Sequence, residues 1–274
     1  MGNFKRGNNF PYRTIKKVKP NGDYRNITAP HFDLKRIQKL ILRSILENYP
    51  VHQSAYGIGK TKTIKYNALE HLKNHNKCLL NLDIQKFFPS ITYLNVKQMY
   101  RELGFSRECS NLLTKLTTFD GSLPQGSPAS PYISSIIFKE LDDYIFQKTS
   151  ERGLMYTRYV DDITISGNFK KSDVFLKKIK SKIKKSGYQL HGENKTELFF
   201  DNEDKIVNNI IILDQGIDVS EKYKQLLILD IGNFKNEEKD LRKIVGKINF
   251  CKYINENTGN HLEDLFNNKK NSLS

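Results

Sequence analysis

Two adjacent aspartates interrupt a segment that is otherwise typical of a β-strand, and this pair restricts the possible folds more than any other feature. Residues 158–166 are RYVDDITIS, in which valine and isoleucine favour a strand whereas aspartate is depleted in strands. Neighbouring side chains of a straight strand point to opposite faces of the sheet. Asp161 and Asp162 can therefore converge only where the chain turns, so we expect a hairpin with MYTRY and ITIS as its strands. Aspartate also favours ordinary solvated turns, and the pair alone leaves that alternative open.

A third carboxylate lies in LLNLDIQKFF, an almost continuously apolar run that predicts a buried strand. Asp83 stands there between Leu82 and Ile84, and an ionised carboxylate on a buried strand is costly unless it is paired or metal-bound. If this strand lies beside the 158–166 hairpin, the acids form one cluster, whose hard oxygen ligands select Mg²⁺. Two Mg²⁺ ions roughly 4 Å apart can activate a 3′-hydroxyl and stabilise a departing pyrophosphate. The acids therefore predict nucleotidyl transfer.

The composition favours a partner that carries phosphates. The 274 residues have a formal net charge of +15 and a pI of about 9.5. Such a charge can serve solubility alone, but a basic surface also gains affinity for nucleic acid by releasing counterions. The three cysteines form no CxxC pair, so neither a zinc site nor a disulfide framework is expected. No apolar run reaches signal-peptide or membrane-spanning length, and we expect a soluble protein of the cytoplasm without a membrane partner.

Interleaved helices and strands without a regular βαβ cadence predict an α+β fold. A hairpin is expected around Pro20-Asn21-Gly22 and another around Asp214-Gln215-Gly216. GSLPQGSPASP must be a loop. Helical spacing of apolar residues predicts helices after Pro30, over 133–145, 173–186 and 238–254.

Three motifs in this order resemble the catalytic core of reverse transcriptases: LDIQKFFPSI, LPQGSPASP and Tyr159-Val160-Asp161-Asp162. The likeness extends to KPNGDYRNI in the fingers, to HGENKTEL after the catalytic hairpin, to IIILDQGIDVS at the primer grip and to VGKINF in the thumb. It implies a right-hand polymerase with fingers, palm and a short helical thumb. The implied boundaries are residues 1–80 for the fingers, 81–215 for the palm with a fingers-proximal insertion around 95–120, and 216–274 for the thumb with a disordered C-terminal tail.

Within that family, SAYGIGKTKTIKYNALEH resembles retron-type enzymes, because residues 67–71 fit their N-A-x-x-H signature. Two departures stand out: Val160 replaces the usual alanine, and Val207-Asn208-Asn209 replaces V-T-G. The resemblance implies an RNA-directed DNA polymerase that copies a dedicated structured noncoding RNA. Priming from a 2′-hydroxyl would give a branched RNA–DNA product, msDNA, in an anti-phage system with a toxic effector protein. Trimming of the template would fall to host RNase H.

The resemblance also assigns the metal ligands. Asp83 and Asp161 would hold two Mg²⁺ ions, the backbone carbonyl of Ile84 would add a ligand, and Asp162 would complete the cluster.

Five further residues would bind the incoming deoxynucleoside triphosphate. Lys19 and Arg25 would clamp its phosphates, Phe88 would be the steric gate against a ribose 2′-hydroxyl, Gln125 would touch nucleotide or template, and Lys195 would pair with acids or phosphate. Four of them have a plainer alternative: a solvated basic hairpin for the first two, core packing for the phenylalanine and a surface position for the last lysine.

Asn67 and His71 stand four apart on an expected helix and so share one face. They are the candidate RNA-binding residues, with a structural role as the alternative. The lysines of 173–186 are interpreted as a solvated face that adds to the positive field.

Two other functions compete with the polymerase. A nucleoprotein scaffold could restrain a toxic effector, although such a scaffold has no need of Asp83. A group II intron-like reverse transcriptase is the third possibility, and the short thumb counts against it.

Overall fold

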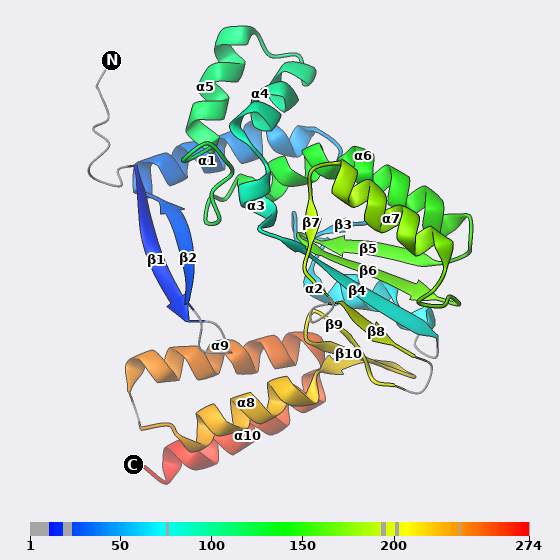
Figure 1. The fold of residues 1–274 in the computed structure, drawn as a ribbon. Helices are drawn as coiled ribbons and strands as arrows, with labels where there is room; N and C mark the ends of the chain where they lie inside the picture. Colours follow the sequence, from blue (N-terminus) through cyan, green and yellow to red (C-terminus); the bar gives the residue numbers. More distant parts are fainter. Residues whose placement is uncertain are drawn as a thin grey trace.

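The structure is a computed structural model that describes residues 11–18, 24–74, 77–192, 196–200, 203–235 and 237–273; the side chains of residues 17, 18 and 24–26 are not described. A central sheet carries helices on both faces, a helical and hairpin region lies beyond one end of it, and three helices form a separate layer near the C-terminus (Figure 1). No helix in the described ranges is long and apolar enough to cross a membrane.

The central sheet has the strand order β3-β5-β6-β4-β7, with β8 also pairing with β4. The sheet strands are β3 (Ala55–Tyr56), β4 (Cys78–Gln85), β5 (Met155–Tyr159), β6 (Asp162–Gly167), β7 (Gln189–Leu190) and β8 (Glu197–Phe199). β5 and β6 form the expected antiparallel hairpin, and β4 pairs with β6 in antiparallel register. The prediction that the Asp83 strand lies beside the 158–166 hairpin is therefore confirmed.

Strict alternation along the strands gives the sheet two different faces. On β4 and β6, Leu80, Leu82, Ile163 and Ile165 enter the larger core. α6 (Ser130–Ser150) and α7 (Val174–Lys185) cover this face (Figure 1). The intervening side chains point to the face that α2 (Ile64–Glu70) covers. Successive residues of a strand face opposite ways, so Asp83 and Asp162 belong to the α2 face.

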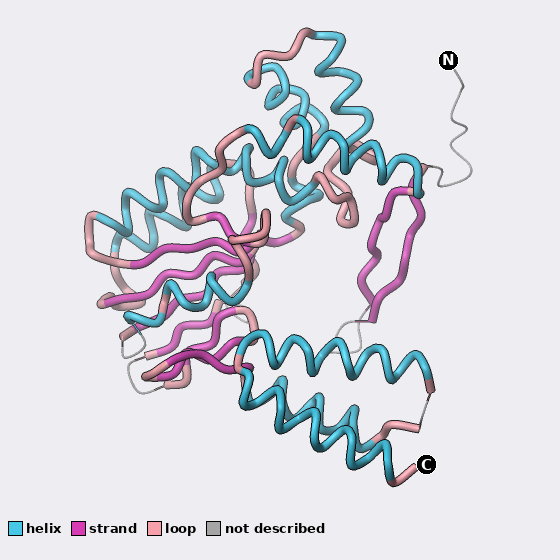
Figure 2. The backbone as a smooth tube through the Cα atoms, turned by 180° about the vertical axis from the view of Figure 1, so that it is seen from behind, coloured by secondary structure: helices cyan, strands magenta, loops and turns pink. Residues whose placement is uncertain are grey.

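The region beyond the sheet combines a hairpin with helices. β1 (Tyr12–Val18) pairs with β2 (Tyr24–Pro30), and α1 (Phe32–Ser44), η1 (Leu46–Asn48), α4 (Tyr93–Glu102) and α5 (Arg107–Thr117) follow in chain order. The buried Gln38 amide joins two of these parts, because Nε2 lies 2.7 Å from the Tyr12 hydroxyl and 2.8 Å from the Leu116 carbonyl oxygen. Seen from behind, the hairpin runs from α1 toward α9 of the C-terminal layer and stands apart from the central sheet (Figure 2).

The C-terminal part has its own core. β9 (Lys205–Val207), β10 (Ile210–Leu213) and β11 (Gly216–Val219) form a three-stranded sheet. α8 (Glu221–Gly232), α9 (Glu238–Ile254) and α10 (Glu256–Asn271) pack on one another. Their shared core contains Leu227 and Ile231 of α8, Ile244 and Ile248 of α9, and Leu262 and Phe266 of α10. The hairpin expected around Asp214-Gln215-Gly216 is β10–β11, since Leu213 pairs with Gly216.

Two expectations about the division of the chain differ from the structure. The polar tail is expected from its sequence to be disordered, whereas α10 continues through Asn271. Leu262 and Phe266 anchor it in the core, and Gly259 permits close contact with α9, because a Cβ there would overlap the backbone of Lys252. The second difference concerns residues 55–74, which the resemblance assigns to the fingers. Their strand β3 pairs with β5, and α2 packs under the sheet, so this segment is part of the central sheet layer.

Candidate active site

The site is built around the two-residue turn that joins β5 to β6. Tyr159 and Asp162 are the last paired residues, so Val160 and Asp161 form the turn. Val160 has a φ of 59° and Asp161 does not have a positive φ, which is the pattern of a type II′ hairpin turn. Glycine normally occupies this first position, and a β-branched residue with positive φ is strained. The turn must therefore be held by its surroundings.

A buried ion pair supplies one of those restraints. The Arg158 guanidinium donates from Nη1 to the Val160 carbonyl oxygen at 2.7 Å. It also donates to both oxygens of Asp142 on α6, at 2.9 Å from Nε and 2.6 Å from Nη2, and both side chains are 0% exposed. The Tyr156 hydroxyl donates to the same carboxylate at 2.5 Å, and burial, with the Asp142 charge beside it, raises the pKa of Tyr156 far above its usual range. Side chains on the α6 face of the sheet thus hold the turn in place.

Backbone hydrogen bonds hold the turn from two neighbouring strands. The Ile84 amide of β4 donates to the Asp161 carbonyl oxygen at 3.1 Å, and the Val160 amide donates to the Tyr56 carbonyl oxygen of β3 at 3.3 Å. The Ile84 side chain is buried in the core. The turn carrying Asp161 is therefore tied directly to the strand carrying Asp83.

Asp83 and Asp162 lie directly opposite each other on β4 and β6. Residues paired in this way in antiparallel strands have Cα atoms about 4.5–5.5 Å apart and side chains on the same face. His191 flanks the pair, with its amide donating to the Asp83 carbonyl oxygen at 2.9 Å and its Nε2 lying 3.8 Å from Asp83 Oδ2. The Asp83 side chain is 25% exposed, so water and ligands can reach it.

Both carboxylates line a pocket of about 320 Å³ between the central sheet and the C-terminal part. Across the pocket, Asn208 donates from Nδ2 to Asp162 Oδ2 at 2.7 Å, and Asn67 donates from Nδ2 to Asn208 Oδ1 at 2.9 Å. Asn208 and Asn209 have φ values of 51° and 67° and form the turn between β9 and β10. Positive φ at both positions is the type I′ pattern, which asparagine adopts more readily than most residues.

The donor chemistry of this pocket fits a divalent cation. In the described part of the chain, no three His, Cys, Asp or Glu side chains gather closely enough to make a complete metal site. Asp83 and Asp162 nevertheless share one pocket, and Asp161 lies in the adjoining turn. Carboxylate oxygens are the ligands that Mg²⁺ prefers.

The structure describes two of the five expected nucleotide-binding residues in full. Phe88 is half-buried on α3 (Phe87–Ser90), with its ring 5.6 Å from that of Phe87. Gln125 is half-buried in the loop before α6, where the Gly126 amide donates to the Pro124 carbonyl oxygen at 2.9 Å. This loop lies against β2, because a Cβ on Gly126 would be 2.6 Å from the Thr28 carbonyl oxygen.

The side chains of the remaining three expected nucleotide-binding residues are not described. Lys19 and Lys195 lie outside the described residues. Arg25 is described by its backbone alone, in β2 opposite Lys17. Their roles stay predictions.

Asn67 and His71 are both 0% exposed. The His71 ring nitrogens lie 2.7 Å from Ser166 Oγ and 2.8 Å from Thr157 Oγ1, which places the ring against the α2 face of the hairpin strands. Burial lowers the pKa of His71 to about 3, so the ring is neutral. These contacts favour the structural alternative, in which the pair braces the sheet. Direct RNA contact by either residue stays an untested prediction.

The sequence interpretation missed Arg158, Asp142 and Asn208 as parts of the site. The sequence did contain a signal for Arg158. It stands two residues after Tyr156 on the same strand, so the two side chains share one buried face. Asp142 lies 16 positions before its partner Arg158, and Asn208 lies 46 positions after its partner Asp162. No local sequence pattern indicates either contact.

Comparisons with known proteins agree with the motifs. The reverse transcriptase (RNA-dependent DNA polymerase) family matches residues 15–226. The chain is similar to the retron Ec86 reverse transcriptase of Escherichia coli, with 31% identity over 244 residues, covering 88% of this chain and 76% of that protein. It is 34% identical over 165 residues to the retron Ec73 reverse transcriptase of Escherichia coli and 31% identical over 202 residues to the retron Mx162 reverse transcriptase of Myxococcus xanthus. It spans 52% and 41% of those two proteins.

Solved structures show the same architecture. The apo telomerase of Candida tropicalis superimposes with a TM-score of 0.54 at 13% identity, over 90% of this chain and 53% of that one. The telomerase of Candida albicans, in complex with a fragment of telomeric RNA, gives a TM-score of 0.52 at 10% identity, over 91% and 54%. At such identities the likeness concerns the fold alone, which is that of a right-hand polymerase.

Proposed function

The chain belongs to the reverse transcriptase family, in which its curated relatives are retron enzymes, and is therefore an RNA-directed DNA polymerase; we propose that its template is a dedicated structured noncoding RNA. One observation supports the catalytic part of this proposal, and the retron relatives support the template. Asp83 and Asp162 are directly paired across β4 and β6 and line a single pocket, beside a strained turn that carries Asp161. Strain of this kind persists only where the surroundings enforce it, and it concentrates at functional sites.

In this proposal Asp83, Asp161 and Asp162 hold two Mg²⁺ ions, with the Ile84 backbone carbonyl as an added ligand. When bound there, two Mg²⁺ ions would lower the pKa of the attacking 3′-hydroxyl and would compensate the charge of the departing pyrophosphate. The protein fixes the carboxylates before the substrate arrives. The Arg158 contact to Val160 orients the turn, and the Asn208 amide restricts the rotation of Asp162.

The incoming deoxynucleoside triphosphate is bound by residues around this centre. Lys19, Arg25 and Lys195 provide cations for its phosphates, and the arginine fork can hold two oxygens at once. Phe88, which is half-buried near the end of β4, excludes a ribose 2′-hydroxyl. Gln125 contacts the nucleotide or the template from the loop that lies against β2.

The RNA partner gives the product its form. Priming from a 2′-hydroxyl within the RNA yields a branched RNA–DNA molecule, and host RNase H removes the copied template. The nucleoprotein acts in the cytoplasm with an effector protein in anti-phage defence. The similarity to retron reverse transcriptases and the N-A-x-x-H signature at residues 67–71 support these proposed steps.

Sequencing the nucleic acid that co-purifies with the protein tests the template assignment. We expect one RNA species, covalently joined to complementary DNA through a bond that a debranching enzyme cleaves. A heterogeneous mixture of cellular RNA would contradict a dedicated template. Primer extension on a generic annealed RNA template with Mg²⁺ and deoxynucleotides tests the polymerase separately, and a nucleoprotein scaffold would show no extension there.

A further inference from the structure

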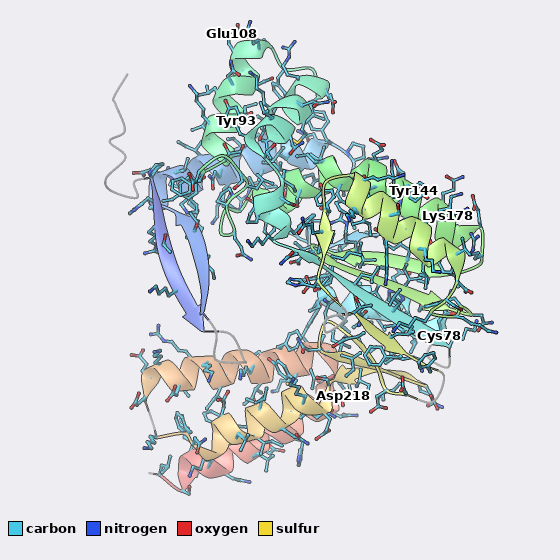
Figure 3. All side chains as sticks on the ribbon, viewed as in Figure 1. Cys78, Tyr93, Glu108, Tyr144, Lys178 and Asp218 are labelled. Carbon is cyan, nitrogen blue, oxygen red and sulfur yellow. The ribbon has the colours of Figure 1, made fainter. Side chains whose placement is uncertain are left out.

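A basic surface lies on the opposite side of the sheet from the carboxylates. A groove of about 350 Å³ runs between α6 and α7 and is lined by Tyr144, Val174, Lys177, Lys178, Ser181, Lys182 and Lys185. Figure 3 shows Tyr144 and Lys178 in the α6–α7 layer, with the sheet between them and the helices of the C-terminal part. Asp83 and Asp162 face the other way, because they alternate with the residues that pack under α6. A nucleic acid strand in the catalytic pocket therefore does not occupy this groove.

The lysines of the groove form a continuous stripe. The α7 positions that line it follow the i, i+3, i+4 spacing of one helix face, and Lys177 and Lys185 lie about 12 Å apart along the axis at 1.5 Å per residue. α7 itself, VFLKKIKSKIKK, contains no acidic residue. Lys178 and Lys182 stand in the unfavourable like-charge i, i+4 relation. Glu140 of α6 approaches Lys182 at 3.7 Å but is 89% exposed, so it compensates little of this charge. A helix face that concentrates positive charge in this way has its best complement in an anion with several charges.

The chemistry of the groove favours phosphates over bases or protein. Tyr144 is its single aromatic among the described lining residues, and Lys182 Nζ lies over that ring at 5.6 Å from the centroid. Proteins that bind single strands offer several aromatic platforms for base stacking. Protein interfaces are depleted in lysine and centre on aromatic or arginine anchors. A nucleic acid duplex, by contrast, presents several phosphates over about 12 Å, since it carries one charge per 1.7 Å or so.

We propose that the α6–α7 groove binds the phosphate backbone of a base-paired stem of the partner RNA, outside the polymerase site. This inference rests on the proposed function and adds to it. RNA helices are recognised mainly by shape and backbone contacts. The groove holds a stem while the template end of the same RNA reaches the carboxylates on the other face.

The test compares two probes. One is a short primer annealed to an RNA template, and the other is the same duplex with an RNA hairpin of about 16 base pairs, the length that spans two minor grooves, joined through a single-stranded spacer. The groove variant carries Lys177→Gln, Lys178→Gln, Lys182→Gln and Lys185→Gln. The control variant removes the same charge from the same region, outside the groove lining, with Lys170→Gln, Lys171→Gln, Lys180→Gln and Lys184→Gln.

We expect the hairpin to raise the affinity of the wild-type protein and of the control variant, and the groove variant to lose this gain. Loss of four phosphate contacts should weaken binding of the hairpin probe on the order of tenfold. It should also lower the slope of log affinity against log salt concentration by about 3.6. Equal losses of affinity in the groove and control variants would show that net charge alone determines binding of the hairpin, and would overturn the inference. An unchanged gain in all three proteins would do the same and would leave an acidic protein as the occupant.

Primer extension on the short probe separates this inference from the proposed function. All three proteins should extend it at similar rates, because no lysine that is changed belongs to the catalytic pocket. Absence of extension by the wild-type protein would count against the polymerase assignment instead.

Discussion

The Arg158 guanidinium donates a hydrogen bond of 2.7 Å to the carbonyl oxygen of Val160, the residue with positive φ in the turn between β5 and β6. The same side chain is held by Asp142 at 0% exposure. A buried pair on one face of the sheet thus fixes the geometry of a carboxylate turn that serves the other face. Preorganisation of this kind determines how closely the carboxylates match the geometry that the reaction requires.

Arg158→Lys should lower kcat for primer extension more than it changes KM. Lysine keeps the charge, but its single ammonium cannot bind both Asp142 oxygens and Val160 at once. We expect reduced melting temperature as well, because disturbing a buried pair costs up to about 3–5 kcal/mol. Steady-state kinetics and thermal melts check both effects.

A triple variant distinguishes positioning from stability. Asp142→Leu with Arg158→Met and Tyr156→Phe replaces the pair, and the hydroxyl that donates to it, by apolar side chains, which is often neutral for stability. Stability should recover while kcat stays low, since nothing then donates to the Val160 carbonyl. Recovery of both would assign the pair a structural role only.

Asp83→Asn and Asp161→Asn should each abolish DNA synthesis and leave RNA binding largely intact. In the proposed site, each change removes a charge that would bind Mg²⁺, and it leaves the basic surface unaltered. Primer extension and electrophoretic shifts measure the two properties. Asp120→Asn, on an exposed turn with positive φ, is the matched control and should behave like the wild-type protein. Near-normal extension by either site variant would refute the metal assignment.

Asn208→Gly should reduce kcat about tenfold or more. A hydrogen bond to a charged group contributes about 1.5–3 kcal/mol, and glycine removes the amide that restrains Asp162 while tolerating the positive φ of the turn. Asn209→Gly preserves the same turn, and no hydrogen bond from its side chain to Asp162 is described, so it serves as the control. Equal activity of the two variants would show that the hydrogen bond from Asn208 to Asp162 does not contribute to catalysis and that Asn208 only accommodates the positive φ of the turn.

Acidification should destabilise the protein through His71. Its pKa is about 3 in the folded protein and about 6.5 when exposed. Between these values the unfolded chain binds more protons, so this contribution is fully present above pH 6.5 or so and falls by about 1.4 kcal/mol per pH unit below it. Denaturant unfolding at several pH values measures the free energy of unfolding. Its dependence on pH below about 6.5 should be weaker for His71→Gln than for the wild-type protein. The same slope in both proteins would contradict a neutral buried ring.

Phe88→Val should raise ribonucleotide incorporation relative to deoxynucleotide incorporation. A smaller side chain leaves space for the 2′-hydroxyl if Phe88 is the steric gate. Competition assays with paired triphosphates measure the ratio. If Phe88 only packs against Phe87, both activities should fall together with the melting temperature, since truncation of a core phenylalanine to alanine costs about 3–5 kcal/mol.

The sequence alone was enough to predict several local elements and the class of reaction. Apolar alternation and turn residues are local properties, so they are enough to predict the 158–166 hairpin, the strand of Asp83 and the lysine-rich helix. The resemblance of three ordered motifs was enough to name the family. Sequence also predicted that both Asp161 and Asp162 lie in a turn, because adjacent strand residues face apart. This is right for Asp161, whereas Asp162 is the first residue of β6 and pairs with Asp83.

Only the tertiary structure decided which distant groups act on that turn. The contact of Arg158 with Asp142 and that of Asn208 with Asp162 join residues whose separation in sequence carries no periodic signal. Burial likewise placed Asn67 and His71 inside the protein, although their helical spacing allowed either face to be exposed. The tail became helical because α9 offers it an apolar surface, a stabilisation that polar residues 267–271 do not provide by themselves. Packing and burial depend on the whole fold, and short sequence patterns do not encode them.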